Sequence, residues 1–285
     1  MPVAIITGAS KGLGRALAGA LAERGWDLVV DARSAGPLAE AARALAGAGG
    51  RVVALPGDVA DGGHRTALVA AAGELGGLDL VVNNASALGA EPLVRLADLP
   101  LEGLRRALEV NVVAPLGMLQ TALPLLRCSS YWESYEGDFL YRGTAPHIGG
   151  ADGRDMSESP YYGEPDVAPG RQPGGAVLSI SSDAAVEAYP TWGGYGAAKA
   201  ALDQQSAVLA VEEPGLRVWW VDPGDMRTDL YAAAVPDDDA DRPLPETVVP
   251  ALLRLLDGAA PSGRYTAAEL LRPAGTGTSG GTGSR

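Results

Sequence analysis

The sequence predicts an α/β fold in which a parallel β-sheet carries helices on both faces. Short apolar runs alternate with amphipathic helical segments along most of the 285 residues, and this alternation is typical of a parallel sheet. The apolar runs are also continuous, as expected for strands that are buried on both faces. Because crossovers between parallel strands are right-handed, the pattern indicates a doubly wound sheet, the Rossmann fold.

The N-terminal half begins with an apolar run at residues 3–7, which predicts a buried strand. Leucines recur every four residues from Leu13 to Leu21, so they predict a helix that reaches residue 24 and ends at Gly25. The same alternation continues after this helix. It predicts strands at residues 27–31, 51–55 and 78–83, and helices at residues 37–46, 61–75 and 98–127.

The C-terminal half resumes the alternation beyond residue 173. It predicts strands at residues 176–180 and 216–221, and helices at residues 194–211 and 246–256. All these elements fit one sheet, so we expect a single domain over residues 1–272. Residues 273–285 are rich in glycine, threonine and serine and are expected to form a disordered tail.

Residues 128–173 interrupt the pattern and are predicted to form an irregular insertion. They hold five of the nine tyrosines and show no sustained periodicity, and a connection of this length inside a domain is uncommon. The preceding helix runs antiparallel to the strands, so the insertion should start at the amino edge of the sheet, opposite the edge where such folds bind ligands. We therefore expect a peripheral excursion. It either docks on the domain flank or a neighbouring subunit, or forms a mobile acidic loop without a partner.

Composition and charge exclude several classes of function. The chain has 22 basic and 35 acidic residues and a net charge of −13, so its surface repels nucleic acids and anionic membranes. Its one cysteine, Cys128, excludes an internal disulfide framework and a cysteine zinc site. No apolar run approaches the ~20 residues of a membrane span, and the N-terminus lacks the basic region of a signal peptide. We expect a cytoplasmic protein that binds neither nucleic acid nor membrane.

The basic residues are almost all arginine, because only Lys11 and Lys199 among the 22 are lysines. Lysine is a compact charge whose pKa shifts readily, whereas arginine is a broad fork that keeps its charge. A chain with this bias keeps lysine where arginine would fail. Both lysines lie within motifs, so we expect both to have a function.

A glycine-rich turn, TGASKGLG at residues 7–14, joins the first predicted strand to the first helix. Glycines allow the backbone to approach a pyrophosphate closely, and a helix N-terminus offers free amides and the positive end of its dipole. The spacing is G-x3-G-x-G rather than the general G-x-G-x-x-G. Such a turn alone is weak evidence for a function, but its position after an N-terminal strand predicts a dinucleotide-binding loop.

With this spacing, the sequence resembles the classical type of the short-chain dehydrogenase/reductase family over residues 2–127 and 174–271. The blocks that carry the resemblance follow one another in the family's order. They are TGASKGLG at residues 7–14, DV at 58–59, NNAS at 83–86, Asn111 within VNVVAPLG, ISS at 180–182, YGAAK at 195–199 and PGDMRT at 223–228. Ser86 departs from the pattern, because the family usually has glycine there, and its hydroxymethyl group should crowd the backbone beside the nicotinamide ribose.

The predicted catalytic residues are Asn111, Ser182, Tyr195 and Lys199. Tyr195 and Lys199 are four residues apart in a helical segment and therefore share a face. The lysine ammonium should lower the pKa of the phenol, ordinarily about 10, toward neutral pH. Ser182 follows a buried strand at the family's spacing before Tyr195, so the resemblance implies that its hydroxyl polarises the substrate oxygen. The resemblance gives Asn111 the role of holding a water that links Lys199 to solvent.

The resemblance implies a nicotinamide cofactor that exchanges hydride with a carbonyl or alcohol carbon. NADP(H) is favoured over NAD(H), because the position that selects NAD aligns with Ala32, whereas Arg33 and Lys11 fall where the family binds the 2′-phosphate. Asp31 should pair with Arg33, and Asp58 should accept from the adenine amino group. The predicted cofactor-binding residues are Gly8, Ser10, Lys11, Gly12, Leu13, Gly14, Arg33, Asp58, Val59, Asn84, Ala85, Tyr195, Lys199, Pro223, Gly224, Met226 and Thr228.

The substrate should bind over the carboxyl ends of the strands. The loops there are largely apolar and aromatic, which favours a medium-sized apolar ketone or alcohol. The expected lining is Leu88, Val186, Tyr189, Trp192, Met226, Leu230 and Tyr231. Arg227 is expected at the surface. His64, at the start of a surface helix, and His147 lack metal-ligand spacing, so no metal is expected.

These features predict an oxidoreductase that interconverts a ketone and a secondary alcohol. We expect a homodimer or homotetramer, since family members commonly associate through their helices. Two alternatives stay open: an NAD-dependent alcohol dehydrogenase of the same family, and a non-catalytic protein that binds a nucleotide as a sensor or scaffold. The catalytic set argues against a pure binder, which has no use for Tyr195.

Overall fold

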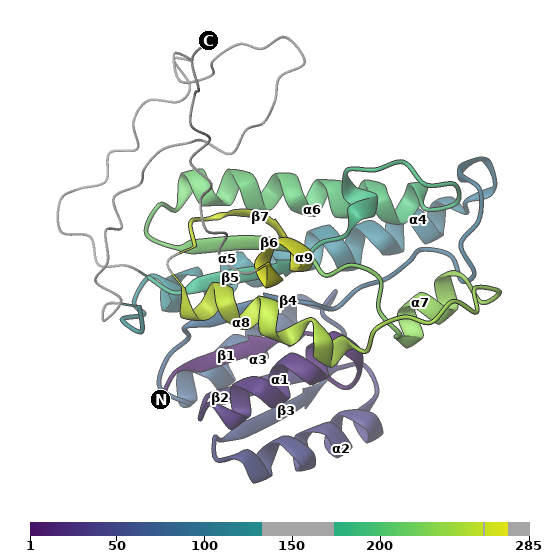
Figure 1. The fold of residues 1–285 in the computed structure, drawn as a ribbon. Helices are drawn as coiled ribbons and strands as arrows, with labels where there is room; N and C mark the ends of the chain where they lie inside the picture. The colour runs from purple at the N-terminus through teal and green to yellow at the C-terminus, as the bar shows by residue number, and fades with distance from the viewer. Residues whose placement is uncertain (133–173, 259, 273–285) are drawn as a thin grey trace, which may run out of the picture.

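A computed structural model describes residues 1–132, 174–258 and 260–272, and its centre is a seven-stranded parallel sheet (Figure 1). The strand order is β3-β2-β1-β4-β5-β6-β7, and every neighbouring pair is parallel. The chain winds outward from β1 through β2 and β3, and then in the other direction from β4 to β7. The switch point therefore lies between β1 and β4, and the predicted doubly wound Rossmann fold is confirmed.

The strands are short, and all but one follow the predicted apolar runs. Their bounds are β1 Val3–Ile6, β2 Asp27–Ala32, β3 Val52–Pro56, β4 Leu80–Asn83, β5 Ala176–Ile180, β6 Arg217–Asp222 and β7 Gly263–Thr266. The sequence analysis missed β7, whose four residues read GRYT. This edge strand is only partly buried, so no apolar run marks it.

Strands β1 to β6 supply side chains to two separate cores, because successive side chains point to opposite faces of the sheet. One core joins the sheet to α1 (Gly12–Glu23), α2 (Ala35–Leu45) and α8 (Val249–Asp257). The other joins it to α3 (Gly62–Glu74), α5 (Ala114–Leu126) and α6 (Gly193–Glu212). In Figure 1, α1 and α8 lie together on the near face of the sheet. The helices thus cover both faces of the sheet. Loops lie at the amino and carboxyl ends of the strands, which are called here the amino edge and the carboxyl edge.

The helix predicted at residues 98–127 is divided. α4 (Leu101–Leu108) continues through a π-helical turn, Glu109–Val113, into α5. Such turns occur mostly inside α-helices and frequently at functional sites. Two short helices also escaped prediction, α7 (Asp229–Ala234) and α9 (Ala267–Leu271), because each is too short to show a helical period.

The helical stretch Leu101–Leu126 bears on the prediction that no apolar run approaches the ~20 residues of a membrane span. It has 26 residues, and an 18-residue window within it has a mean hydropathy of 1.2, enough to cross a membrane by length and composition alone. The core helix of a soluble protein passes the same test, so this is weak evidence. Here α5 packs against α3 and β4, as a core helix does.

Residues 127–132, which follow α5, stay at the amino edge of the sheet, as the direction of that helix requires. Ser129 donates to Asp79, just before β4, at 2.6 Å. Trp132 is 1 % exposed and lies edge to face with Trp219 of β6, with ring centroids 6.2 Å apart. The Arg217 guanidinium lies 4.4 Å from the centroid of the Trp132 ring. The beginning of the predicted insertion is therefore anchored in the core rather than on the flank.

Three predictions concern residues outside the described ranges. The irregular structure of residues 133–173, the tail at residues 273–285 and the role of His147 all fall there. They stay predictions.

Candidate active site

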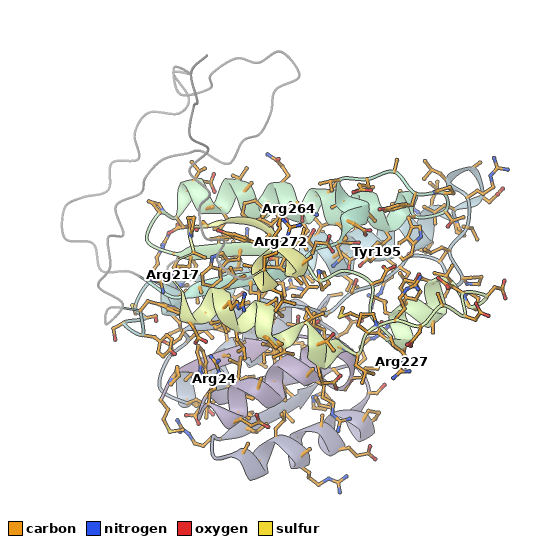
Figure 2. All side chains as sticks on the ribbon, in the orientation of Figure 1. Arg24, Tyr195, Arg217, Arg227, Arg264 and Arg272 are labelled. Atoms are coloured by element: carbon orange, nitrogen blue, oxygen red, sulfur yellow. The ribbon has the colours of Figure 1, made fainter. Side chains whose placement is uncertain are left out.

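A cavity of about 1070 Å³ opens at the carboxyl edge of the sheet. Its wall comes from the turn after β1, the ends of β2, β4, β5 and β6, the start of α6, and α7. In Figure 2, Tyr195 and Arg227 lie toward this end of the molecule and Arg24 and Arg217 toward the other. The predicted site residues that line the cavity are Gly8, Ser10, Lys11, Gly12, Leu13, Arg33, Asp58, Val59, Asn84, Ala85, Ser182, Tyr195, Lys199, Pro223, Gly224, Met226 and Thr228.

The turn between β1 and α1 offers backbone donors to the cavity. Gly8 and Gly12 have φ values of 66° and 58°, which favour glycine. α1 begins without a side-chain cap and without an acidic residue in its first turn. Its first amides therefore have no side-chain acceptor, and a helix N-terminus of this kind is suited to bind an anion.

Gly14 lies behind the turn and does not line the cavity, and its predicted contact with a cofactor stays a prediction. A Cβ at Gly14 would meet the side-chain amide of Asn84 and would come within 2.8 Å of the Gly8 carbonyl oxygen. The Asn84 amide donates to the carbonyls of Thr7 at 2.8 Å and Gly8 at 3.1 Å. Glycine at position 14 therefore lets β4 hold the turn in place.

Asp31, at the end of β2, pairs differently from the prediction. Its carboxylate accepts from the Gly8 amide at 2.7 Å and lies 3.1 Å from Nε2 of His64, instead of pairing with Arg33. Burial raises the pKa of Asp31, and the hydrogen bonds from Gly8 and His64 offset only part of this rise. Asp31 thus fixes the glycine turn, and His64, predicted at the surface, is drawn into this contact.

Cationic side chains gather at the mouth of the cavity beside the turn, namely Lys11, Arg15 and Arg33. Lys11 forms an ion pair of 2.7 Å with Asp229 of α7, and both side chains are largely exposed. Exposed ion pairs contribute little free energy, so Lys11 can exchange Asp229 for a phosphate. Arg33 follows β2 and is exposed.

The carboxylate of Asp58 already has protein partners. Oδ2 accepts from Arg106 at 2.7 Å and Oδ1 from the Ala60 amide at 3.0 Å. Burial alone would raise the pKa of Asp58, but these hydrogen bonds and the charges of Arg106 and Arg33 outweigh it and lower the pKa. No motif predicts Arg106, so the sequence analysis missed this partner of the predicted adenine-binding residue.

Tyr195 and Lys199 lie on one face of α6 and are 6 % and 2 % exposed. Nζ of Lys199 is 5.5 Å from the centroid of the Tyr195 ring and donates to the Ile180 carbonyl at 2.6 Å. Burial lowers the pKa of Lys199 to about 8, and the negative charge of Asp203 opposes the change. The ammonium thus lies between the phenol and the end of β5.

The pKa of Tyr195 corrects the prediction that Lys199 lowers it. Burial raises the pKa of Tyr195 to about 12, Asp183 and Asp222 add to the rise, and a hydrogen bond with Ser86 opposes it. Lys199 is engaged with a backbone carbonyl, and its charge does not outweigh the burial of the phenol. A phenol with this pKa is protonated at neutral pH and can donate a proton.

Ser182 follows β5 and faces the cavity. Its hydroxyl donates to Oδ1 of Asp183 at 3.0 Å and accepts from the Ala184 amide at 3.2 Å. Its carbonyl accepts from Arg264 at 3.0 Å. The hydroxyl therefore caps the next turn and has a proton that a substrate oxygen can accept in place of Asp183.

Asn111 lies in the π-helical turn, buried behind the cavity wall rather than in it. Its Oδ1 accepts from the Ala87 amide at 3.0 Å and its Nδ2 donates to the Ala87 carbonyl at 2.8 Å. Ser86 donates to the same Oδ1 at 3.0 Å, so the hydroxymethyl group that was expected to crowd the site holds Asn111 instead. The predicted water-mediated link from Asn111 to Lys199 stays a prediction.

Apolar and aromatic side chains line the cavity next to Tyr195. Trp192 lies edge to face with Tyr195 at 5.5 Å between ring centroids, and Tyr231 lies 6.5 Å from Trp192. Two predicted lining residues lie elsewhere, because Val186 is 63 % exposed and Tyr189 is 39 % exposed. The predicted residues that do line this end are Leu88, Trp192, Met226, Leu230 and Tyr231.

Three carboxylates at this end were missed by the sequence analysis, namely Asp183, Asp222 and Asp225. Burial raises the pKa values of Asp222 and Asp225, and the charge of Asp183 raises both further. Arg242 lies 3.4 Å from Asp225 and counteracts part of the rise. Their position directly after predicted strands could have identified them, since cavity residues of this fold gather there.

Two other predictions concern the exposure of Arg227 and the binding of a metal ion. Arg227 is largely exposed, as expected, and lies 4.0 Å from Asp241. Within the described part of the chain, no group of three or more histidine, cysteine, aspartate or glutamate side chains could hold a metal ion.

The cavity residues fit a nicotinamide dinucleotide. The uncapped start of α1 and the glycine turn suit a pyrophosphate. The cations Lys11 and Arg33 line the same cavity, and Arg33 directly follows β2, near which a phosphorylated ribose would be held. The buried phenol of Tyr195 lies at the far end of the same cavity, where a reacting group must be placed.

Known proteins resemble this chain in sequence. The family model described as short chain dehydrogenase matches residues 2–132 and 165–239. An uncharacterized oxidoreductase of Methylorubrum extorquens is 31% identical over 226 residues, which are 78% of this chain and 72% of that protein. The 3beta-hydroxysteroid dehydrogenase 1 of Eggerthella lenta is 28% identical over 250 residues, 86% of this chain and 78% of that protein. By contrast, the chain spans 15% of the glycine betaine reductase of Emericella nidulans, to which it is 29% identical over 231 residues.

Solved structures resemble the chain in fold. An alcohol dehydrogenase from Thermococcus sibiricus, complexed with 5-hydroxy-NADP, superposes with a TM-score of 0.71 at 24% identity over 93% of this chain and 94% of that one. A short-chain type dehydrogenase/reductase from Mycobacterium ulcerans has a TM-score of 0.72 at 22% identity over 95% of this chain and 90% of that one. At these identities the likeness shows the fold.

Proposed function

The chain belongs to the short chain dehydrogenase family of oxidoreductases, and we propose that it is an NADP(H)-dependent enzyme that interconverts a ketone and a secondary alcohol. One observation carries this proposal. Tyr195, Lys199 and Ser182 line the same cavity as the glycine turn that suits a dinucleotide. A protein that only binds a nucleotide has no need of a buried phenol and ammonium at the end of that cavity.

In the proposed reduction, Tyr195 donates its proton to the carbonyl oxygen of the substrate. The nicotinamide, when bound, supplies the hydride to the carbonyl carbon. The Ser182 hydroxyl turns from Asp183 to the same oxygen and stabilises the charge that develops there. Lys199 lies 5.5 Å from the Tyr195 ring and stabilises the phenolate that remains. A phenol with a pKa of about 12 keeps its proton at neutral pH, and the protonated phenol is the form that the reduction requires.

The shape of the cavity supports a medium-sized, mainly apolar substrate. Trp192 and Tyr231 form an aromatic wall beside Tyr195, and Leu88 is buried against the same group of side chains. Such a wall removes water from the reacting carbonyl and strengthens the hydrogen bonds to its oxygen.

The end of β2 supports NADP(H) over NAD(H). Ala32 stands where an acidic side chain would bind a free ribose 2′-hydroxyl, and Arg33 follows it at the cavity mouth. Lys11 lies at the same mouth with only an exposed partner, Asp229. Two cations thus stand within the lining where a 2′-phosphate would be recognised.

The test measures oxidation of NADPH and NADH by the purified protein with a panel of apolar ketones, alongside cofactor binding by fluorescence. We expect turnover with NADPH and slower turnover with NADH. Turnover with NADH alone would make the protein an NAD-dependent dehydrogenase. Tight cofactor binding without turnover across the panel would instead favour a sensor or scaffold.

We also propose that the protein is a cytoplasmic, single-domain homodimer or homotetramer. Apolar side chains on the outer faces of the α4–α5 stretch and α6 support association through these helices, which contact one another. The exposed side chains are Leu101, Val113, Leu116, Val208 and Val211. Light scattering should give the mass of two or four chains, and Leu116→Glu should lower it.

A further inference from the structure

The segment that carries Ser182 is held from behind by an ion pair outside the catalytic set. The hydroxyl of Ser181 donates to Oδ1 of Asp203, and the carbonyl of Ser182 accepts from Nη2 of Arg264 at 3.0 Å. Two successive residues at the end of β5 therefore depend on Asp203 and Arg264 for their orientation. The direction of the Ser182 hydroxyl follows from that orientation.

Asp203 and Arg264 come from different parts of the fold. Asp203 lies on α6. Arg264, labelled in Figure 2, lies on the edge strand β7, and its register partner on β6 is Trp220. Nε of Arg264 is 3.1 Å from Oδ2 of Asp203, and the two side chains are 26% and 12% exposed. The pair thus ties α6, β5 and β7 together at the carboxyl edge.

Asp203 also acts on Lys199. It lies one helical turn beyond Lys199 on α6, as Lys199 lies one turn beyond Tyr195. Burial lowers the pKa of Lys199, and the negative charge of Asp203 raises it. Without this carboxylate, the buried ammonium would lose its proton at a lower pH.

We propose that Asp203 and Arg264 are positioning residues of the active site: the pair orients Ser182 through its carbonyl and through Ser181, and Asp203 places a negative charge one helical turn from Lys199. This inference rests on the proposed function, since it assigns a role in the same reaction. Neither side chain lines the cavity, so both act through Ser182 and Lys199.

The other groups that face Lys199 determine how much each variant should change the charge environment of its ammonium. Tyr195 and Asp203 face it from α6, and the Ile180 carbonyl faces it from β5. From β7, Arg264 pairs with Asp203 and so weakens the effect of its charge. The removal of Asp203 therefore changes the charge environment of Lys199 more than the removal of Arg264 does.

Asp203→Asn keeps the shape of the side chain and removes its charge. We expect kcat for a ketone that the wild type reduces to fall about tenfold or more, because misplaced catalytic groups lower the rate steeply. KM for the ketone should stay within about threefold. The pH at which NADPH affinity declines, which reports the loss of the Lys199 proton, should move to lower values.

Arg264→Lys keeps a positive charge beside Asp203 but cannot bind Asp203 and Ser182 together through a planar fork. We expect a fall in kcat like that of Asp203→Asn, with the pH dependence of NADPH binding unchanged. This variant also keeps the proposal testable if Asp203→Asn does not fold, since it leaves no buried charge without a counter-charge.

Matched controls exist at the amino edge. Glu213, at the end of α6, pairs with Arg127, and its side chain is 10% exposed. Glu213→Gln and Arg127→Lys therefore change an ion pair of similar burial far from the cavity. We expect them to lower the melting temperature as the test variants do, with kcat and the pH dependence of NADPH binding unchanged.

The outcomes separate this inference from the proposed function. If the wild type reduces ketones and the Asp203 and Arg264 variants match their controls in kcat and in pH dependence, the positioning role is wrong and the function stands. If the wild type binds NADPH and reduces no ketone, the proposed function is wrong. NADPH binding then decides the role of Asp203: a lower pH midpoint in Asp203→Asn than in Glu213→Gln supports it, and equal midpoints overturn it.

Discussion

Buried aspartates at the amino edge and at the carboxyl edge of the sheet have pKa values that are shifted in opposite directions. At the amino edge, burial alone would raise the pKa of Asp27, but the hydrogen bonds and charge of Arg51 outweigh it and the pKa is lowered. At the carboxyl edge, burial outweighs the hydrogen bonds, and the pKa values of Asp31, Asp203 and Asp222 are raised. Perturbed groups of the second kind gather at functional sites. Among these buried carboxylates the direction of the pKa shift differs between the two edges, whereas the more exposed Asp58 of the cavity has its pKa lowered by its hydrogen bonds and by the charges of Arg106 and Arg33.

The packing of side chains also differs between the two edges. At the amino edge, Trp26, Tyr131, Trp132 and Trp219 form a chain of edge-to-face contacts that closes the core. At the carboxyl edge, the strands end in loops around a cavity, and the aromatic contact of Trp192 with Tyr195 lies in its wall. Changes at the carboxyl edge should therefore alter turnover, and changes at the amino edge should alter stability.

The largest effect is expected from Tyr195→Phe. Loss of the phenolic proton should lower kcat about 10²–10⁴-fold, the usual contribution of a general acid, while NADPH affinity changes only a few-fold. Steady-state kinetics and fluorescence titration measure the two quantities. Activity above about a hundredth of the wild type would contradict the role of Tyr195 as the acid.

Lys199→Arg should come next, although it conserves the charge. The position is 2 % exposed, and its ammonium fits against the Ile180 carbonyl at 2.6 Å, so a planar guanidinium should displace its neighbours. We expect a fall in kcat of about tenfold or more. Arg51→Lys at the amino edge is the control and should keep kcat. Near-normal kcat in Lys199→Arg would show that the site does not require lysine.

Arg33→Ala tests the cofactor end of the carboxyl edge. Loss of a charge-assisted hydrogen bond to the 2′-phosphate should weaken NADPH binding by about tenfold and leave NADH binding nearly unchanged. Arg43→Ala on α2, outside the cavity wall, is the matched control. Equal weakening of NADPH and NADH would argue against the preference for NADP(H).

Asp27→Asn tests the amino edge. A carboxyl whose pKa is lowered by folding stabilises the protein above its unfolded pKa of about 3.9, and this contribution is lost as the pH falls through the folded pKa. The variant should therefore melt about 2–4 °C lower at neutral pH, and the difference should shrink in acid below the unfolded pKa. Thermal unfolding over a pH series measures both. A fall in kcat with unchanged stability would contradict the expectation that changes at the amino edge alter stability and not turnover.

The smallest effect is expected from Ser86→Gly, which introduces the residue usual in the family. Asn111 keeps both hydrogen bonds to Ala87, so kcat should change by less than about threefold. The interaction with Ser86 opposes the rise in the pKa of Tyr195, so its removal should move the basic limb of the kcat profile to higher pH. An unchanged pH profile would show that Ser86 does not act on the phenol.

Much of the fold could be predicted because a parallel sheet buried on both faces leaves a strong pattern. Continuous apolar runs predict β1, β2 and β4–β6 within one or two residues. The edge strand β7 is partly exposed and carries Gly263 and Arg264, so it lacks that pattern. The π-helical turn at Glu109–Val113 has the composition of a helix, and only the backbone reveals it.

The candidate site could be predicted where a residue lies in a motif at a strand end or on the face of a helix. Tyr195, Lys199 and Ser182 line one cavity as the motifs imply. Arg106 and Arg264 could not be predicted, because each meets its partner across a long stretch of sequence without a fixed spacing. The direction of the Tyr195 pKa shift was wrong for a related reason, since sequence shows the nearby lysine and not the burial of the phenol.

The anchoring of the chain at Trp132 has a consequence for protein engineering. Gly175 donates to the Leu126 carbonyl at 2.7 Å, and Gly174 donates to the Gly215 carbonyl at 2.6 Å. The chain therefore leaves and re-enters the fold at one point of the amino edge. Each doubling of a flexible loop costs only about 0.6 kcal/mol of closure entropy. A reporter or a foreign module grafted between residues 132 and 174 should accordingly leave the sheet intact and project from the end opposite the cavity.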